Sequence, residues 1–150
     1  MLKQYKTYLD ETVIPLRLAC TNRSGWPFVL SLWYLYADGA LYCATQSSAK
    51  IVAHLHNDPR GAFEIAADLP PYCGIRGQVE AEVLPARGGD VLEQLLHRYL
   101  GGTSNSLAKN LLARRATEVA IRLQPISVFA WNFSARMQTS IKPTAKKICP

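Results

Sequence analysis

The segment CGIRGQVEAEVL, residues 73–84, alternates apolar and polar side chains along most of its length, and this alternation constrains the fold most. A period of two is the repeat of a β-strand, because successive side chains point to opposite faces of a sheet. One face carries apolar side chains and the other charged or amide ones: Ile75, Val79, Ala81 and Val83 against Arg76, Gln78, Glu80 and Glu82. The segment therefore predicts a strand with one buried face and one wetter face.

Further strand-like runs, bounded by turn residues, precede and follow this segment. The run 28–36 is apolar and aromatic on both faces, and Asp38-Gly39 predicts a hairpin turn between it and the run 40–45. The other runs are 15–21, 61–68 and 118–133, the last of which is expected to form two strands separated at Pro125. These runs predict a mainly β (β+α) fold with a six- to seven-stranded antiparallel sheet, and such sheets usually close into a barrel that hides their edges.

Three segments space their apolar residues as helices do. Residues 47–57 predict a short helix after the second hairpin strand, which ends before Pro59. A later helical pair is predicted over 90–100 and 104–115, with Asp90 as the N-cap of its first helix and Gly101-Gly102 as the stop.

Length and composition favour a single domain. The chain has 150 residues, of which 49% are hydrophobic, and this is enough for a sizeable core. We expect the core to span about residues 12–133, and residues 134–150 to form a tail or arm because periodicity is lost there. The first residues lack the apolar segment of a signal peptide, and no window resembles a membrane span, so a cytoplasmic protein is expected.

Charge and cysteine content narrow the function classes. The net charge of +6 suits a nucleic acid or an anionic small molecule, but the positive residues are scattered and form no basic stripe. The charged fraction of 19% is low, which suggests that a partner chain covers some apolar surface.

The cysteines are Cys20, Cys43, Cys73 and Cys149. They form no CxxC motif, so no metal site is predicted, and those in strand-like runs are expected to be small core residues in a reducing setting.

The stretch TQSSAK, residues 45–50, places hydroxyl groups and a lysine at a strand end and a helix start. Backbone N–H groups at a helix start point toward an anion, and the helix dipole favours negative charge there. Ser47, Ser48 and Lys50 could therefore bind a phosphate. The alternative is that one of the serines is an N-cap and Lys50 is a solvated surface charge.

The order of these features resembles that of the pyridoxamine 5′-phosphate oxidase-like family, the FMN-binding split β-barrels. The shared pattern covers roughly residues 12–137 and consists of a DG-x-LY hairpin, a strand ending in Thr, a Lys in the next helix, NDPR, a strand with a central Gly, VAIRLQP and WNF followed by ARM. Its first parts are Asp38-Gly39-Ala40-Leu41-Tyr42, Thr45, Lys50, Asn57-Asp58-Pro59-Arg60 and Arg76-Gly77-Gln78-Val79-Glu80. The resemblance implies a split β-barrel that binds FMN, as a homodimer with the cofactor groove at the interface.

The resemblance also implies which residues contact the cofactor. The phosphate is expected at the helix start, on Ala44, Thr45, Ser47, Ser48 and Lys50. The flavin ring is expected against the backbone of Ser31, Leu32 and Trp33, and Trp131 matches a tryptophan that reaches the flavin from the partner chain. For Ser31 and Trp33 the alternative is a sheet face packed on a helix, and for Trp131 it is a core tryptophan at a strand end.

Two departures from the family pattern bear on the function. The stretch after Trp131 carries Arg136 but no histidine, which argues against pyridoxamine phosphate as the substrate of this small-molecule site. Lys50 stands alone where the family has a paired Arg-Lys, and Arg76 is a candidate for the missing cation. The sequence thus favours an FMN-dependent oxidoreductase of unknown substrate, with no catalytic residue identified. The alternatives are a non-catalytic flavin, deazaflavin (F420) or haem binder, acting as a carrier or sensor, and, less favoured, a nucleic-acid-binding module.

Overall fold

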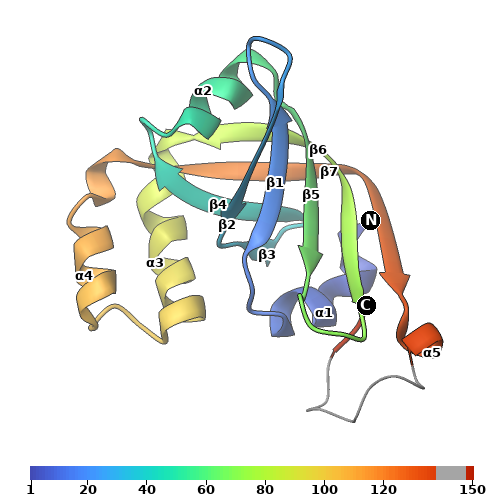
Figure 1. The fold of residues 1–150 in the computed structure, drawn as a ribbon. Coiled ribbons are helices and arrows are strands. Elements are labelled where there is room, and N and C mark those ends of the chain that lie inside the picture. The colour runs from blue at the N-terminus through green and yellow to red at the C-terminus, as the bar shows by residue number, and fades with distance from the viewer. Residues whose placement is uncertain (138–147) are drawn as a thin grey trace.

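The computed structural model describes residues 1–137 and 148–150, and its strands form one antiparallel seven-stranded sheet (Figure 1). The strands are β1 (Leu16–Thr21), β2 (Pro27–Leu32), β3 (Leu35–Ala37), β4 (Ala40–Gln46), β5 (Arg60–Ala66), β6 (Cys73–Leu84) and β7 (Glu118–Asn132). Their order across the sheet is β2-β1-β5-β6-β7-β4-β3. The predicted fold class is confirmed. In the described part of the chain β2 and β3 do not pair with each other, so the curled sheet is split and not closed.

Helices surround this sheet. They are α1 (Lys6–Glu11), α2 (Lys50–Asn57), α3 (Gly88–Leu100), α4 (Ser106–Leu112) and α5 (Ser134–Met137), with short 3₁₀ turns at Leu2–Tyr5, Pro85–Arg87 and Arg115–Thr117. Figure 1 shows α3 and α4 together on one side of the molecule, and α2 at the opposite end from α5. Among the described residues, no helix has both the length and the apolar character needed to cross a membrane.

The pairing of β6 with β7 connects the two halves of the sheet. β6 pairs with β7 from Cys73 to Leu84, while β5 joins the first part of β6 and β4 joins the first part of β7. The sequence predicted two strands separated at Pro125, and this is wrong. Pro125 instead lies opposite Val79 at a bulge, where the pairing skips Ile126, so that one continuous strand absorbs the proline.

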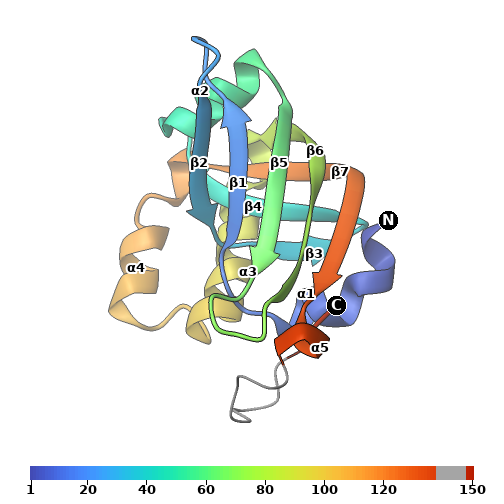
Figure 2. The ribbon, with the colours of Figure 1, turned by 45° about the vertical axis from the view of Figure 1, so that its right-hand side comes forward.

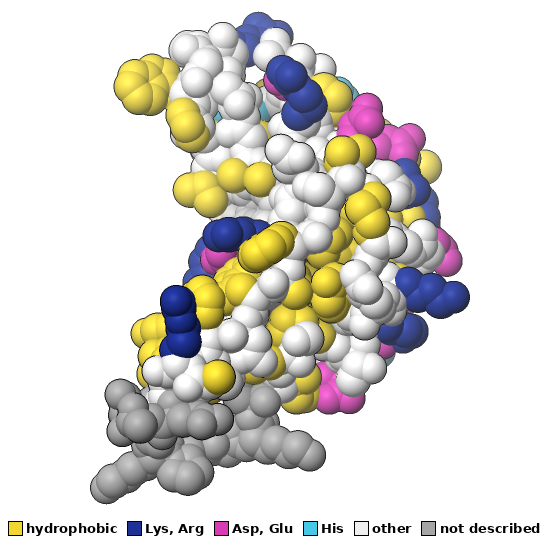
Figure 3. Space-filling view, turned by 90° about the vertical axis from the view of Figure 1, so that its right-hand side faces the viewer, with side chains coloured by type: hydrophobic (Ala, Val, Ile, Leu, Met, Phe, Trp, Pro, Cys, Tyr) yellow, Lys and Arg dark blue, Asp and Glu magenta, His cyan; other side chains and the backbone are white. Residues whose placement is uncertain are grey.

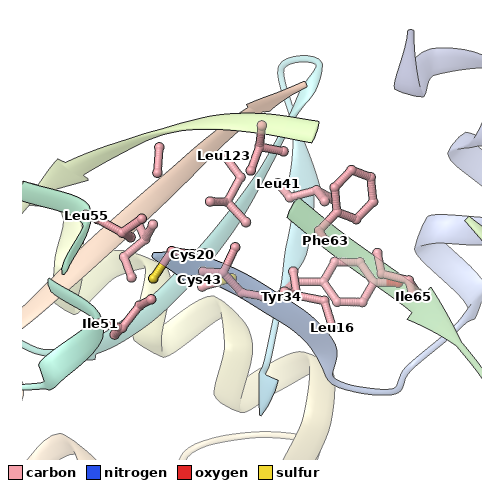
Figure 4. Close-up of a cluster of buried hydrophobic side chains, with 14 of the residues drawn as sticks. Leu16, Cys20, Tyr34, Leu41, Cys43, Ile51, Leu55, Phe63, Ile65 and Leu123 are labelled. Atoms are coloured by element: carbon pink, nitrogen blue, oxygen red, sulfur yellow. The ribbon is translucent and has the colours of Figure 1, made fainter. Parts of the chain in front are cut away.

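The main hydrophobic core lies inside the curl of the sheet, and α2 covers one end of it. Figure 4 shows Ile51 and Leu55 of α2 pointing toward Cys20, Cys43 and neighbouring strand residues. The N-terminal segment, which lies outside the core expected from the sequence, also contributes Leu2, Tyr8 and Leu9 to this cluster. A second pair of clusters lies between α3, α4 and the other face of β4 and β7.

The predicted strand 28–36 is interrupted at Trp33 and Tyr34, and the N-terminal helix explains the break. The Tyr34 N–H donates to the Tyr99 hydroxyl of α3 at 3.2 Å, and the Tyr34 hydroxyl donates to the carbonyls of Leu9 and Thr12 at 3.0 and 2.8 Å. Arg98 adds hydrogen bonds to carbonyl groups at the end of α1, with Nη2 2.6 Å from the Leu9 oxygen. These contacts anchor α1 and draw the chain out of the strand.

The helix starts also differ from the prediction. α2 begins at Lys50 and not at residue 47. α3 begins at Gly88, so Asp90 is not its N-cap but lies in its first turn. There the Asp90 carboxylate forms an ion pair with Arg115 at 2.8 Å. A 3₁₀ turn leads directly into α3, which moves its start toward the N-terminus. The predicted stop is confirmed, because Gly101 is the C-cap with a positive φ of 73°.

The sequence predicted that Cys20, Cys43 and Cys73 are small core residues in a reducing setting; all three are buried, but Cys73 is not a free thiol. Cys73, the first residue of β6, forms a disulfide with Cys149, whereas Cys20 and Cys43 are free and buried. The disulfide attaches the end of the chain to the sheet, so the predicted tail is fixed at Cys149; residues 138–147 of that tail lie outside the described residues. The disulfide removes the cysteine argument for a reducing compartment, and a cytoplasmic location stays a prediction.

We expect a thiol titration of the unfolded protein, purified without reductant, to find two thiols, because Cys73 and Cys149 are paired, and four after treatment with a dithiol. The Cys149→Ser variant should show three thiols in both conditions, because Cys73 loses its disulfide partner and becomes a third free thiol. Four thiols in the untreated wild-type protein would contradict the cross-link.

Candidate functional site

The candidate site begins at the junction between β4 and α2. β4 ends at Gln46, and the Ala49 N–H donates to the Gln46 carbonyl at 2.9 Å, which closes a tight turn. The Ser47 N–H donates to the Thr117 carbonyl at 2.8 Å, which fixes this turn against the start of β7. Ser47, Ser48 and Lys50 therefore follow one another on a turn whose backbone is held by neighbouring elements.

Neither serine caps α2. The N-cap position is Ala49, and no side chain makes a capping hydrogen bond there. Ser47 and Ser48 are exposed, and Lys50 is exposed and forms no ion pair with any described residue. The helix start thus presents uncapped backbone N–H groups beside two hydroxyl groups and an ammonium group, which is a donor set suited to an oxyanion.

A polar network centred on the buried Glu118 supports this turn. The Gln46 Nε2 donates to Glu118 Oε1 at 2.6 Å, and the Thr117 hydroxyl donates to Gln46 Oε1 at 2.5 Å. Glu118 is only 7% exposed, and its Oε2 has no hydrogen-bond partner within the described residues. Burial raises the pKa of Glu118, opposed by the hydrogen bond from Gln46 and the charge of Arg114. No local sequence pattern marks these residues, because Glu118 resembles any acidic residue before a strand.

The expected ring-binding residues lie where β2 ends. β2 pairs only with β1, so its other edge offers unpaired backbone N–H and C=O groups within the described part of the chain. Ser31 is exposed, whereas Leu32 packs against the main core. The Trp33 ring stacks on Tyr99 of α3 with 4.9 Å between ring centroids, and it packs in the same cluster as Ala44. Trp33 therefore sits under α3, as the alternative described, which leaves β2 backbone as the open surface.

Ala44 and Thr45 lie on opposite faces of β4. Ala44 packs in the cluster beneath α3 and α4, whereas Thr45 pairs with Val119, whose side chain belongs to the main core. Of the residues expected at the phosphate, the structure thus brings Ser47, Ser48 and Lys50 to the surface together, half-buries Thr45 beside them, and places Ala44 under the helical pair.

Trp131 lies far from Ser31 on the same outer face of the sheet. Figure 2 shows β2, β1, β5, β6 and β7 side by side in front of β4 and β3. β2 and β7 are four strand spacings apart, which gives a path of about 19 Å along the sheet. Ser31 and Trp131 of one chain therefore do not meet, and Trp131 instead lies over Gly74, where a Cβ would come within 2.9 Å of its ring.

Arg76 does not lie beside Lys50. Its side chain is on the outer face of β6, because the flanking Ile75 points into the core, and α2 packs on that core side. The Arg76 guanidinium carbon lies 5.5 Å from the centre of the Phe129 ring and 5.4 Å from that of Trp131. The described residues of one chain hold no group of three or more His, Cys, Asp or Glu side chains arranged for a metal ion.

Comparison with known proteins identifies the fold. No protein-family model matches the sequence, and no curated protein matches it. Among solved structures, a conserved hypothetical protein of Mycobacterium tuberculosis has a TM-score of 0.74 at 19% identity, over 98% of this chain and 93% of that one. An F420 reductase has a TM-score of 0.66 at 21% identity, over 83% and 94% of the two chains. A haem storage protein of Vibrio cholerae, HutZ, has a TM-score of 0.65 at 15% identity, over 85% and 93%.

Two other similar structures bear on the resemblance found in the sequence. One is a protein of Listeria innocua provisionally described as a pyridoxamine 5′-phosphate oxidase, and another is a FAD-binding protein of Mesorhizobium loti. The chain has the pyridoxamine 5′-phosphate oxidase-like split-barrel fold, which confirms the resemblance at the level of the fold. Solved proteins with this fold include flavin-binding and haem-storing members.

The buried carboxyl group of Glu118 generates a prediction about pH. Its raised pKa means that the folded protein holds this proton more tightly than the unfolded chain does. Its contribution to stability is thus fully present below the ordinary Glu pKa and is lost as the pH rises through the raised folded-state value. We expect Glu118→Gln, which keeps an acceptor for Gln46, to increase the free energy of unfolding at pH 7 relative to the wild type.

This gain should vanish at acidic pH, where the carboxyl is protonated in both states, as measured by urea unfolding across the pH range. The control variant Glu93→Gln, at an exposed position, should not increase the free energy of unfolding at pH 7. A pH-independent effect of Glu118→Gln would show that the network does not bury a charge.

Proposed function

We propose that the chain is an FMN-dependent oxidoreductase that acts on a small molecule other than pyridoxamine phosphate. One observation carries this proposal: α2, whose uncapped start bears the exposed Ser47, Ser48 and Lys50, contacts the open edge strand β2 through His54 and Phe28, in a fold shared with an F420 reductase and a FAD-binding protein. On this proposal, the helix start binds the phosphate of a flavin mononucleotide and the strand edge binds its ring.

The donor set fits the phosphate. The Lys50 ammonium is a compact positive charge, the serine hydroxyls are donors, and the helix dipole adds a partial positive charge. The site holds one lysine and not a pair of cations, and backbone N–H groups make up part of the difference. On this proposal, the free N–H and C=O groups of β2 near Ser31 hold the polar edge of the ring.

The bound flavin would supply hydride or electron transfer, while the protein supplies binding and orientation. On this proposal Ser47, Ser48 and Lys50 bind the cofactor and take no part in acid–base chemistry. The haem alternative needs an axial His or Cys, yet the free thiols Cys20 and Cys43 are buried and His54 packs edge-on against Phe28 at 4.9 Å. The exposed His56 and His97 lie on two different helices, α2 and α3, and neither is at the start of α2. Flavin is therefore the preferred cofactor.

The proposal includes a homodimer formed through the outer face of the sheet. This face carries exposed apolar side chains, which on a monomer favour association: Val29 at 66%, Phe129 at 59% and Ile126 at 55%, with Trp26 at 72% in the turn before β2. A two-fold axis through the middle of the face would set β7 of one protomer against β2 of the other, because these strands lie on either side of β1, β5 and β6. Trp131 would then reach the partner's flavin, which it cannot do within its own chain.

Light scattering at micromolar concentration should give the mass of a dimer. Phe129→Glu would place a charge of β7 against the partner's β2 and should shift the protein toward the monomer, whereas Leu107→Glu on the exposed side of α4 should not. A monodisperse wild-type monomer would refute the dimer.

Loss of the Lys50 ammonium tests the phosphate site. A charge-assisted hydrogen bond is worth about 1.5–3 kcal/mol, so Lys50→Ala should weaken FMN binding by about tenfold to a hundredfold. Riboflavin lacks the phosphate and should bind the variant and the wild type alike. Ser48→Ala should act in the same direction but less, because the backbone donors remain.

Fluorescence titration of the apoprotein with both ligands measures these affinities. Lys109→Ala, at an exposed lysine of α4, is the matched control and should leave FMN affinity unchanged. If Lys50→Ala leaves FMN affinity unchanged, or weakens riboflavin equally, then Lys50 is only a surface charge.

A further inference from the structure

The outer face of the sheet contains a groove of about 530 Å³ that crosses β1, β2, β5, β6 and β7. Figure 3, seen from the right of Figure 1, shows this side of the molecule hollowed, with hydrophobic and Lys or Arg side chains next to each other at the hollow. We call it the outer groove; its lining includes Val29, Glu64, Arg76, Gln78, Ser127 and Phe129. This volume lies within the range of small-molecule sites, about 300–1,000 Å³.

Arg76 is the unusual residue of the outer groove. Its guanidinium rests against the Phe129 and Trp131 rings, yet it makes no hydrogen bond or ion pair with a described residue. Arg17 on the same face differs, because it donates to Asp68 at 2.7 Å and to the Ala66 carbonyl at 3.3 Å. The aromatic contacts limit where the Arg76 side chain can lie, so its N–H donors are held in place and remain unused.

The residues next to Arg76 add a carboxylate and other polar side chains to the outer groove. Glu64 lies directly opposite Arg76 on β5, and it too forms no ion pair with a described residue. Cross-strand side chains of opposite charge at such positions normally attract each other. On the other side, the Ser127 hydroxyl donates to Gln78 Oε1 at 3.2 Å. The outer groove thus offers a fixed cation, a free carboxylate and an exposed aromatic ring at paired positions on the neighbouring strands β6, β5 and β7.

We propose that the outer groove binds a small organic anion with a flat ring. Its oxyanion, a carboxylate or a phosphate, pairs with Arg76, whose planar fork matches such groups. Its ring lies against Phe129, and an N–H or O–H group of the ligand donates to Glu64. The inference deepens the proposed function on which it rests, because in the proposed dimer Trp131, the residue that supports Arg76, faces the partner's flavin. The substrate class is then an aromatic or heteroaromatic anion.

Benzoate and benzamide form a matched pair of probes, since they share the ring and differ in the charge. We expect isothermal titration calorimetry of the full chain to give at least tenfold tighter binding of benzoate. Arg76→Gln should abolish this preference and Arg76→Lys should retain part of it, while Phe129→Leu should weaken both probes. Arg87→Gln is the matched control, because Arg87 also rests on a ring, 5.1 Å from the centre of Tyr42, but lies outside the outer groove.

Equal affinity for the two probes, or a preference that survives Arg76→Gln, would overturn the inference. FMN titration of the same variants separates the two proposals. If Arg76 governs the benzoate preference but the wild type binds no FMN, the outer groove stands and the flavin proposal fails. If FMN binds the wild type and the Arg76→Gln variant equally while benzoate shows no preference, only the substrate class is wrong.

Discussion

The pairing of β6 with β7 is the constraint on which the rest of the structure depends. This ladder runs the whole length of β6, and each strand carries a different half of the sheet on its free side. The two strands bend together at the bulge beside Gly77, where a Cβ would lie 2.0 Å from the Ser127 carbonyl oxygen. Only a glycine permits this approach without moving the backbone, so the bend of the sheet at this point requires glycine at position 77.

The curl separates the two faces of the molecule by function. Inside it lies the core that α2 covers, so that the start of α2 is held at the surface beside the end of β4. Outside it lies the continuous face that bears the outer groove and Trp131, with the open edge of β2 as its limit. Because Ser31 on β2 and Trp131 on β7 lie at opposite sides of this face, our proposal requires a second chain to complete the flavin site.

Local patterns predicted local structure well. The alternation over 73–84 corresponds to β6, and Asp38 and Gly39 adopt the positive φ angles, 50° and 77°, that a tight hairpin turn requires. What the sequence could not predict depends on partners far along the chain. The strand break at Tyr34 follows from its hydrogen bond with Tyr99, and the disulfide joins cysteines 76 residues apart. The stretch TQSSAK predicted a helix directly after β4, although α2 begins at Lys50 and not at residue 47, whereas the supporting contact between Gln46 and Glu118 required the three-dimensional fold.

The visible absorption spectrum of the purified protein, recorded before and after the addition of FMN and gel filtration, distinguishes a flavoprotein from the alternatives. We expect the two visible bands of an oxidised flavin, retained with the protein at about one flavin per chain and lost on heat denaturation. A deazaflavin would give a single band at shorter wavelength, which would keep the anion site and change the cofactor. A Soret band, or a protein that stays colourless after mixing with FMN, would refute the FMN proposal.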